Sequence, residues 1–375
     1  MNSILAEISK LRKGVELVID YRNSNKYRVV AIEPNGSRTA YYFSTPIYNN
    51  RTRKAVDLKF HSKGEVIYSL GSNANITITR NIRMENSEGF SIISLDNPST
   101  RISEHEVLCG KVRIYPTTNG VAIRSDCQIE KPCLFSLEIS KPFLEVRAND
   151  KYFALMSEKF RPFVSVSCIG TSDTNGKIIS PAKLNYQKIS DRKYTISIAP
   201  CSSFGKSVVF EINLYEPKLF QDTTVESANP QTNNAFGSIA FLGTTKEFGE
   251  QWLYARPDFS KMTELNDKKI IRAILHLPKL NNGITEFTAS KVAARFCSFG
   301  STWSNKIAEA GALTDAQITD QYIDFNLTSM LSDKYGRLSK SEGFILKAKK
   351  KDKGFSVVST GDNYLTPQIL EINYR

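Results

Sequence analysis

The chain has 375 residues, of which 41% are hydrophobic and 23% are charged, and its formal net charge is +12. The length allows two or three domains with cores of their own, and the composition excludes wholesale disorder. No apolar run approaches the roughly 20 residues of a membrane-spanning helix, so we expect no membrane insertion. The positive charge suits an anionic glycan, a nucleic acid or an anionic membrane as partner, and equally suits solubility alone.

Residues 1–13 predict a short N-terminal helix that serves as a docking segment. Ile4, Leu5, Ile8 and Leu11 recur at the spacing of one helical face. Because so short a helix is marginal in water, this face needs a partner surface, either in its own chain or in a neighbouring subunit. The segment lacks the features of a signal peptide, so we expect synthesis in the cytoplasm and, for action outside the cell, release by lysis, by a dedicated machine or on a particle.

Two β domains are predicted next, over residues 14–103 and 104–218. Runs of about five residues with β-branched and aromatic side chains alternate with turn residues, as strands and their connections do. Asn35-Gly36 is the strongest hairpin signal, and Asn119-Gly120 and Asn175-Gly176 mark two further turns. The range 104–218 is expected to form a β-sandwich.

The six cysteines contain no Cys-x-x-Cys pair, which argues against zinc ribbons and thioredoxin-like chemistry. Most are expected to be small buried residues on strands. A Cys127–Cys133 bridge is the less favoured alternative. We expect no cofactor, while leaving room for a structural Ca²⁺ ion.

Residues 219–375 carry the most specific pattern of the chain. Short strands alternate with bends rich in Gly, Asn and Pro, as in a β-sandwich. Characteristic stretches, in chain order, are Asp222-Thr-Thr-Val-Glu-Ser, Gln251-Trp-Leu-Tyr-Ala-Arg-Pro-Asp-Phe, Trp303-Ser-Asn, Gly343-Phe-Ile-Leu-Lys-Ala-Lys and Pro367-Gln-Ile-Leu-Glu-Ile-Asn-Tyr. Their order resembles the DNRLRE domain family, which is grouped with carbohydrate-binding module family 96. The family's name-giving six-letter run is not present literally, and Arg256-Pro257 interrupts one segment, so the resemblance implies the fold more directly than the ligand.

Glycan binding requires aromatic faces and polar or charged groups that satisfy hydroxyls or an acidic group. The final domain supplies both, and the candidate ligand-binding residues are Trp303, Asn305, Trp252, Tyr254, Arg256, Asn363, Tyr364, Lys349, Lys350 and Lys351. Each Trp also suits a sandwich core, and the three lysines also suit a solvated hairpin tip. Trp303, in a Ser-Thr-Trp-Ser-Asn loop, is the better candidate for an exposed aromatic residue.

Catalysis has weaker support. His276 alternates on an apolar strand, where a hydrogen-bonded core position is the favoured interpretation, and no catalytic residue is assigned. A glycosidase pair could be drawn from Asp222, Asp258, Asp324 and Asp362, although turn capping explains such residues more simply. No helix-turn-helix, RNP-like strand or zinc finger supports nucleic acid as a partner.

The sequence therefore predicts an all-β protein, with consecutive antiparallel β-sandwich domains and a short N-terminal helix. We expect a non-enzymatic structural or adhesion protein of a virion or phage-tail-like particle, which binds cell-surface, anionic glycan through residues 219–375. Other particle subunits, including copies of itself, are expected partners. The alternatives are an assembly protein without sugar binding and, less favoured, a polysaccharide-degrading enzyme.

Overall fold

The structure is a computed structural model, and it describes residues 4–48, 56, 58–63, 66–71, 75–79, 81–95, 100–143, 145–157, 162–202, 206–215, 218–281, 283, 286–350 and 354–375. The chain divides into two compact units. Unit 1 contains Tyr48–Pro217, and unit 2 combines Ile4–Ile47 with Lys218–Arg375.

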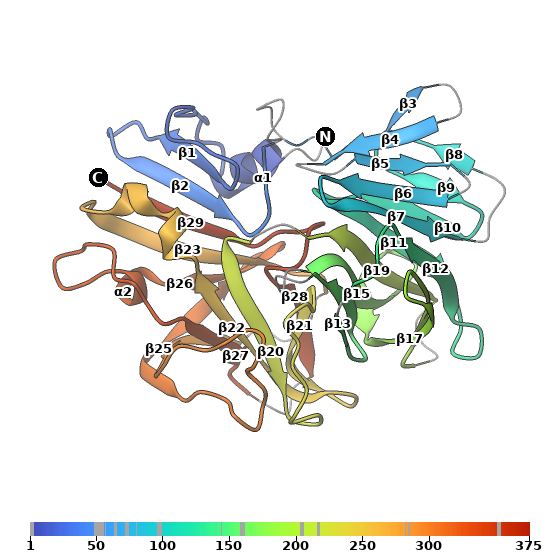
Figure 1. The fold of residues 1–375 in the computed structure, drawn as a ribbon. Helices are drawn as coiled ribbons and strands as arrows, with labels where there is room; N and C mark the ends of the chain where they lie inside the picture. Colours follow the sequence, from blue (N-terminus) through green and yellow to red (C-terminus); the bar gives the residue numbers. More distant parts are fainter. Residues whose placement is uncertain are drawn as a thin grey trace. The chain divides into compact units, whose positions relative to one another are not determined.

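Unit 1 consists of two antiparallel sheets (Figure 1). The first follows the order β13-β14-β15-β19-β11-β10-β9-β8, with β16 paired to β15, and its strands are β8 Thr100–Ile102, β9 Val107–Cys109, β10 Val112–Pro116, β11 Gly120–Asp126, β13 Glu145–Ala148, β14 Tyr152–Met156, β15 Pro162–Ser172, β16 Ile178–Ser180 and β19 Ser207–Leu214. The second follows the order β17-β18-β12-β7-β6-β5-β4-β3, with β3 His61–Lys63, β4 Val66–Leu70, β5 Asn75–Ile78, β6 Asn81–Asn86, β7 Gly89–Ser94, β12 Cys133–Ile139, β17 Ala182–Ser190 and β18 Lys193–Pro200.

The core of unit 1 lies between these sheets. Alternation along β18 buries Tyr194, Ile196 and Ile198 on one face, as expected for a half-buried strand. Phe135 of β12 stacks on Phe210 of β19, with ring centroids 5.3 Å apart, and so joins the two layers. None of the six cysteines, all of which lie in the described part of the chain, forms a disulfide bond, so the Cys127–Cys133 bridge is absent.

The ranges 14–103 and 104–218 do not form separate units. Strand β7 pairs with β12, and β8 pairs with β9, so both ranges contribute to the same pair of sheets. Residues 14–47 belong instead to unit 2. The assignment of residues 14–47 to unit 2, and of residues 48–217 to unit 1, depends on pairing between strands far apart in the sequence. Local sequence patterns do not encode such pairing.

Unit 2 is also a β-sandwich. Its strands are β1 Arg28–Ile32, β2 Arg38–Phe43, β20 Phe220–Glu226, β21 Ile239–Thr245, β22 Gly249–Pro257, β23 Ile270–Pro278, β24 Phe287–Val292, β25 Glu309–Ile318, β26 Tyr322–Asn326, β27 Phe344–Ala348, β28 Phe355–Ser359 and β29 Ile369–Tyr374. They pair in the order β1-β2-β29-β23-β26-β25-β24-β27-β22-β21-β28, with β20 beside β22. Strand β25 pairs with both β24 and β26, so it continues from one layer into the other. Leu275 and Leu370 of one layer and Leu253 and Leu346 of the other share one core.

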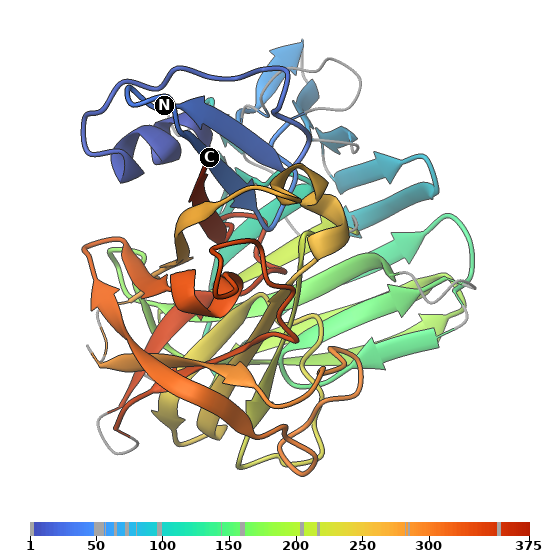
Figure 2. The ribbon, with the colours of Figure 1, turned by 90° about the vertical axis from the view of Figure 1, so that its left-hand side faces the viewer.

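The N-terminal segment completes one layer of unit 2. A tight turn with Gly36 at φ 79° joins β1 to β2, as the Asn-Gly pair predicted, and β2 pairs along its length with the final strand β29. Helix α1 (Ile4–Leu11) lies near this hairpin and buries Ile8 fully (Figure 2). Tyr322 of β26 donates a hydrogen bond to Glu7 of α1 at 2.9 Å, so the helix docks on its own chain.

The predicted all-β class and the short N-terminal helix are confirmed. The other helical elements among the described residues are α2 (Thr328–Leu331), which follows β26, and the 3₁₀ turns η1 (Phe259–Lys261) and η2 (Thr263–Leu265). Within the described residues, no helix has the length and apolar character needed to cross a membrane.

Candidate functional site

Three of the predicted ligand-binding residues, Trp252, Tyr254 and Arg256, lie on the face of β22 that points away from the main core of unit 2. Side chains along this strand alternate between two environments. Leu253 and Ala255 point into the main core of unit 2, whereas Trp252, Tyr254 and Arg256 lie on the opposite face. On the neighbouring strand β27, Lys347 lies on the same face as Trp252, because Leu253 pairs with Leu346 in an antiparallel register.

The loop of residues 293–308 covers part of this face. Phe296 of the loop packs on Tyr254, with ring centroids 5.5 Å apart, and the Tyr254 hydroxyl donates to the carbonyl of Ile307 at 2.8 Å. The loop is held by amide side chains. Asn305 accepts the N–H of Thr302 at 2.7 Å, and Asn233 donates to the carbonyls of Ser298 and Ser301. Its backbone is therefore fixed by several bonds that do not involve a ligand.

Two indole rings, Trp252 of β22 and Trp303 of the loop, lie against each other. The rings of Trp252 and Trp303 are tilted by 56° with centroids 5.1 Å apart, and both side chains are half-buried. The Trp252 indole N–H donates to Glu250 at 2.8 Å, which fixes the orientation of that ring. Both rings pack against the small core formed by Val225, Tyr254, Val292, Phe296 and Ile345, and part of each side chain remains exposed.

Two ammonium groups lie over these rings. Lys306 places its Nζ 4.3 Å from the Trp303 ring centroid and 5.8 Å from that of Trp252. Lys347 lies 5.1 Å from the Trp252 centroid and forms an ion pair with Glu309. Lys306 is exposed, and among the described residues no carboxylate lies within ion-pair distance of it. We call Trp252, Trp303, Lys306 and Lys347 the tryptophan platform.

The structure brings together only part of the predicted site. Trp252 and Trp303 form the platform, and Asn305 is exposed beside Lys306, although its amide also donates to the carbonyl of Gly300. Arg256 is half-buried on the same face, and its Nε has no hydrogen-bond partner in the described part of the chain. Tyr254 is buried beneath the loop, because its ring fills the small core there.

Two other candidates are buried elsewhere. Asn363 and Tyr364 lie in the connection between β28 and β29, with exposed fractions of 0% and 3%. The Asn363 side chain accepts the N–H of Thr366 at 2.7 Å, which shapes this connection. The structure therefore does not place these two side chains on the exposed surface with the tryptophans.

Two of the three candidate lysines at the predicted hairpin tip form ion pairs with carboxylates. Lys349 pairs with Asp315 at 2.8 Å and Lys350 with Glu286 at 3.2 Å, all at exposed positions. The hydrogen bond to Asp315 raises the pKa of Lys349. Lys351 lies outside the described residues. Sequence reasoning did not select Lys306, although its position three residues after Trp303 in the same loop was a usable signal.

The four aspartates considered for catalysis lie at three different places and do not form one site. Asp258 accepts the N–H of Ser260 and caps η1, as turn capping predicted. Asp324 accepts a hydrogen bond from Nδ1 of His276 at 2.8 Å. Asp222 and Asp362 meet at Lys218, where both are buried.

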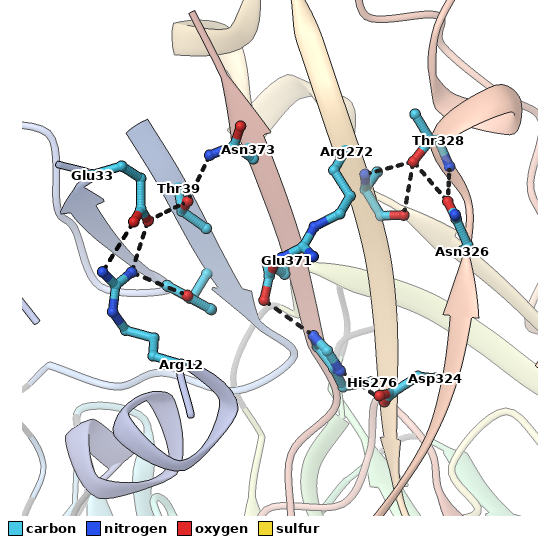
Figure 3. Close-up of polar contacts among 12 residues, drawn as sticks. Arg12, Glu33, Thr39, Arg272, His276, Asp324, Asn326, Thr328, Glu371 and Asn373 are labelled. Carbon is cyan, nitrogen blue, oxygen red and sulfur yellow. Dashed lines mark hydrogen bonds and ion pairs between the residues drawn. The ribbon is translucent and has the colours of Figure 1, made fainter. Parts of the chain in front are cut away.

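His276 is the centre of a second polar cluster, on the outer face of the layer that contains β23 (Figure 3). Its Nε2 lies 3.5 Å from Glu371, which in turn pairs with Arg272. Burial lowers the pKa of His276, but the hydrogen bond to Asp324 and the negative charges of Asp324 and Glu371 outweigh it and leave the pKa above its ordinary value. The imidazole is therefore held between two carboxylates, and with 4% of its surface exposed it is inaccessible to a substrate.

No group of His, Cys, Asp or Glu side chains with the geometry of a metal site occurs among the residues that the structure describes. At the Asp222–Asp362 pair, the ammonium of Lys218 lies where a cation would bind. These residues thus do not fit the structural Ca²⁺ ion for which the sequence left room.

Scans against protein-family models and against curated proteins find no match to this chain.

Proposed function

We propose that unit 2 is a glycan-binding module and that the tryptophan platform contacts the sugar. The observation that carries the proposal is the pairing of two partly exposed indoles with an exposed ammonium, Lys306, that no carboxylate neutralises in the described part of the chain. Indole faces stack on the apolar face of a sugar ring, and a nearby cation favours an acidic substituent. The preferred ligand class is therefore an anionic cell-surface polysaccharide.

The resemblance of residues 219–375 to the DNRLRE family supports the same ligand class. We further propose that the protein is a non-enzymatic structural or adhesion component of a phage or phage-tail-like particle. Neighbouring genes for tail or capsid proteins would support this setting. A neighbourhood of metabolic or carbohydrate-degrading genes without particle genes would contradict it.

Binding to a panel of polysaccharides tests the ligand proposal. The full chain is titrated with anionic cell-wall polymers, a polyuronate and a neutral glucan, and binding is followed by tryptophan fluorescence. Both tryptophans of the chain belong to the platform, so the signal comes from the proposed site alone. We expect binding to an anionic polymer that weakens as the salt concentration rises.

Three variants separate the contributions. We expect Trp303→Ala to weaken binding about tenfold or more, corresponding to about 1.4 kcal/mol. Lys306→Gln should weaken binding to anionic polymers and reduce the salt dependence, while leaving any binding to the neutral glucan unchanged. Lys349→Gln is the matched control, because it removes an exposed lysine that is already paired with Asp315 and should not alter binding.

A purely structural role is the competing function, and the partial burial of both indoles favours it. In that case the rings stabilise the loop of residues 293–308 and bind nothing. This structural role is supported if the full chain binds none of the polysaccharides, or if the Trp303→Ala variant binds as tightly as the wild type.

A further inference from the structure

A lysine and two aspartates form a buried cluster at the start of the second segment of unit 2. Lys218 lies two residues before the start of β20, Asp222 lies on β20, and Asp362 lies in the connection that leads to the last strand β29. The Nζ of Lys218 contacts Oδ2 of Asp362 and lies 4.0 Å from Oδ1 of Asp222. The exposed fractions of Asp222 and Asp362 are 2% and 8%. We call these three residues the lysine–aspartate cluster.

The surroundings of the cluster are largely apolar. The buried Phe236 ring lies 6.0 Å from the Lys218 ammonium, and the adjacent Leu219 and Phe220 are each 1% exposed. One oxygen of Asp222 accepts the N–H of Gly361, and the other has no hydrogen-bond partner in the described part of the chain. A Cβ at Gly361 would lie 2.9 Å from this second oxygen, so glycine is needed for the close approach. Buried carboxylates without full hydrogen bonding are costly, and a proton on one of them lowers the cost.

The protonation states in this environment differ from those in water. Burial raises the pKa of Asp222 to about 7, Lys218 opposes this shift, and Asp362 adds to it. Burial likewise raises the pKa of Asp362, against the influence of Lys218. Both carboxyl groups therefore hold a proton more readily than in water, and transfer of one proton from Lys218 to Asp362 would give a neutral amine in contact with a neutral carboxyl group.

We propose that Lys218 and Asp362 condense spontaneously to form an intramolecular isopeptide bond, with Asp222 as the acid–base group. The Lys218 Nζ attacks Cγ of Asp362, and a C–N bond forms. The C–Oδ bond then breaks, and the hydroxyl group leaves as water with a proton from the Asp222 carboxyl. Asp222 regains a proton from the nitrogen, so the reaction releases one water molecule and consumes no other reactant. Proximity and desolvation favour this condensation in the interior, although it is unfavourable in water.

The bond would join the start of β20 to the segment that precedes β29. It closes a covalent loop around almost the whole second segment of unit 2, and such a link stabilises a fold by restricting its unfolded state. None of the residues of the lysine–aspartate cluster belongs to the tryptophan platform. A test of the isopeptide bond is therefore independent of whether unit 2 binds a sugar.

Mass spectrometry of the purified full-length protein is the test. We expect the intact mass to be lower than the sequence mass by one water molecule. Digestion should yield a branched peptide that joins Lys218 to Asp362, and hydroxylamine, which opens succinimides, should leave it intact. An intact mass equal to the sequence mass overturns the proposal, as does a water loss that maps to other residues or disappears with hydroxylamine.

Variants test the assigned roles. Lys218→Gln and Asp222→Asn should both have their full sequence masses, and under denaturing electrophoresis they should migrate more slowly than the compact wild-type chain. The second variant is the more specific, because it keeps both reacting groups. Lys349→Gln removes an exposed lysine that also contacts an aspartate, and it should still lose one water molecule. A branched Lys218–Asp362 peptide from the Asp222→Asn variant would overturn the role of Asp222.

Discussion

His276 shows how one buried side chain depends on charges from several strands. On β23 it faces Asp324 of β26 directly across the sheet, and Glu371 of β29 approaches its second nitrogen. The Tyr322 ring packs edge-on against the imidazole, with centroids 5.8 Å apart, and Arg272 is the further cation that contacts Glu371. Because the pKa of His276 is raised and that of Glu371 is lowered, each group is more stable in its charged form in the folded protein.

The sign of the pH dependence follows from these shifts. The stability that His276 contributes is fully present below its unfolded pKa of about 6.5 and is lost as pH rises through the raised pKa of the folded state. For Glu371 the contribution is present above its unfolded pKa of about 4.3 and is lost as pH falls through the lowered folded pKa. Unit 2 should therefore be most stable between these two limits.

We predict that His276→Gln destabilises unit 2 by about 3 kcal/mol near pH 6, because it leaves Asp324 and Glu371 without a cation between them. The same variant should lose part of the decrease in stability that the wild type shows as pH rises from about 6.5 through the raised pKa of folded His276. Urea unfolding followed by tryptophan fluorescence reports this, since both tryptophans lie in unit 2. Parallel pH profiles for variant and wild type would contradict the prediction.

The sequence predicted the environment of single side chains more reliably than it predicted which residues contact them. The alternation of apolar residues placed His276 in a buried strand with a hydrogen-bonded side chain, and this is what the structure shows. The partners Asp324 and Glu371 are about 50 and 95 residues away along the chain, and only strand register brings them together. Trp252 and Trp303 were both selected from the sequence, but the contact between their rings depends on how the loop folds over β22, which no local pattern specifies.

At the scale of elements, the final strand β29 depends on a hairpin from the other end of the chain. Strand β2 pairs with β29 over Arg38–Tyr374 to Phe43–Ile369, and Val30 and Tyr42 contribute fully buried side chains to the core of unit 2. Tyr42 and Arg28 also bind Glu264, which follows β22. Residues 28–43 are thus an integral part of this sandwich.

We predict that residues 218–375 alone do not form a stable monomer. Loss of Val30 and Tyr42 removes about 4 kcal/mol of apolar burial, at about 2 kcal/mol for each side chain. It also leaves β29 as an unpaired, apolar edge that other chains can join. Size-exclusion chromatography and thermal unfolding of the fragment are the measurements. A monomeric fragment with the melting temperature of unit 2 in the full chain would contradict the prediction.

The strands themselves were largely predictable, whereas their grouping was not. The stretch Pro367-Gln-Ile-Leu-Glu-Ile-Asn-Tyr contains β29, and the Asn35-Gly36 turn joins β1 to β2. Both signals are local, because alternation and turn chemistry act over a few residues. The pairing of β2 with β29 spans more than 300 residues, and no local pattern specifies such a partner.

At the scale of the whole molecule, unit 1 is an insertion within unit 2. The chain leaves unit 2 after Ile47 and returns at Lys218. These two points lie close together within unit 2: Ile47 donates to the carbonyl of Lys26, and Lys261 contacts both the adjacent Tyr27 ring and the carbonyl of Lys218. Closely spaced ends are what the insertion of one domain into another requires.

We therefore predict that a chain in which a short Gly/Ser linker replaces residues 48–217 folds into an intact unit 2. Its second segment is the fragment 218–375, so the pair of proteins differs only in the N-terminal segment and the linker. The linked protein should be monomeric, should show the tryptophan emission of the full chain, and should unfold at the temperature of the unit 2 transition, because every strand of the sandwich is retained. If the linked protein aggregates as the fragment does, the insertion is not separable, and the stability of unit 2 depends on residues 48–217.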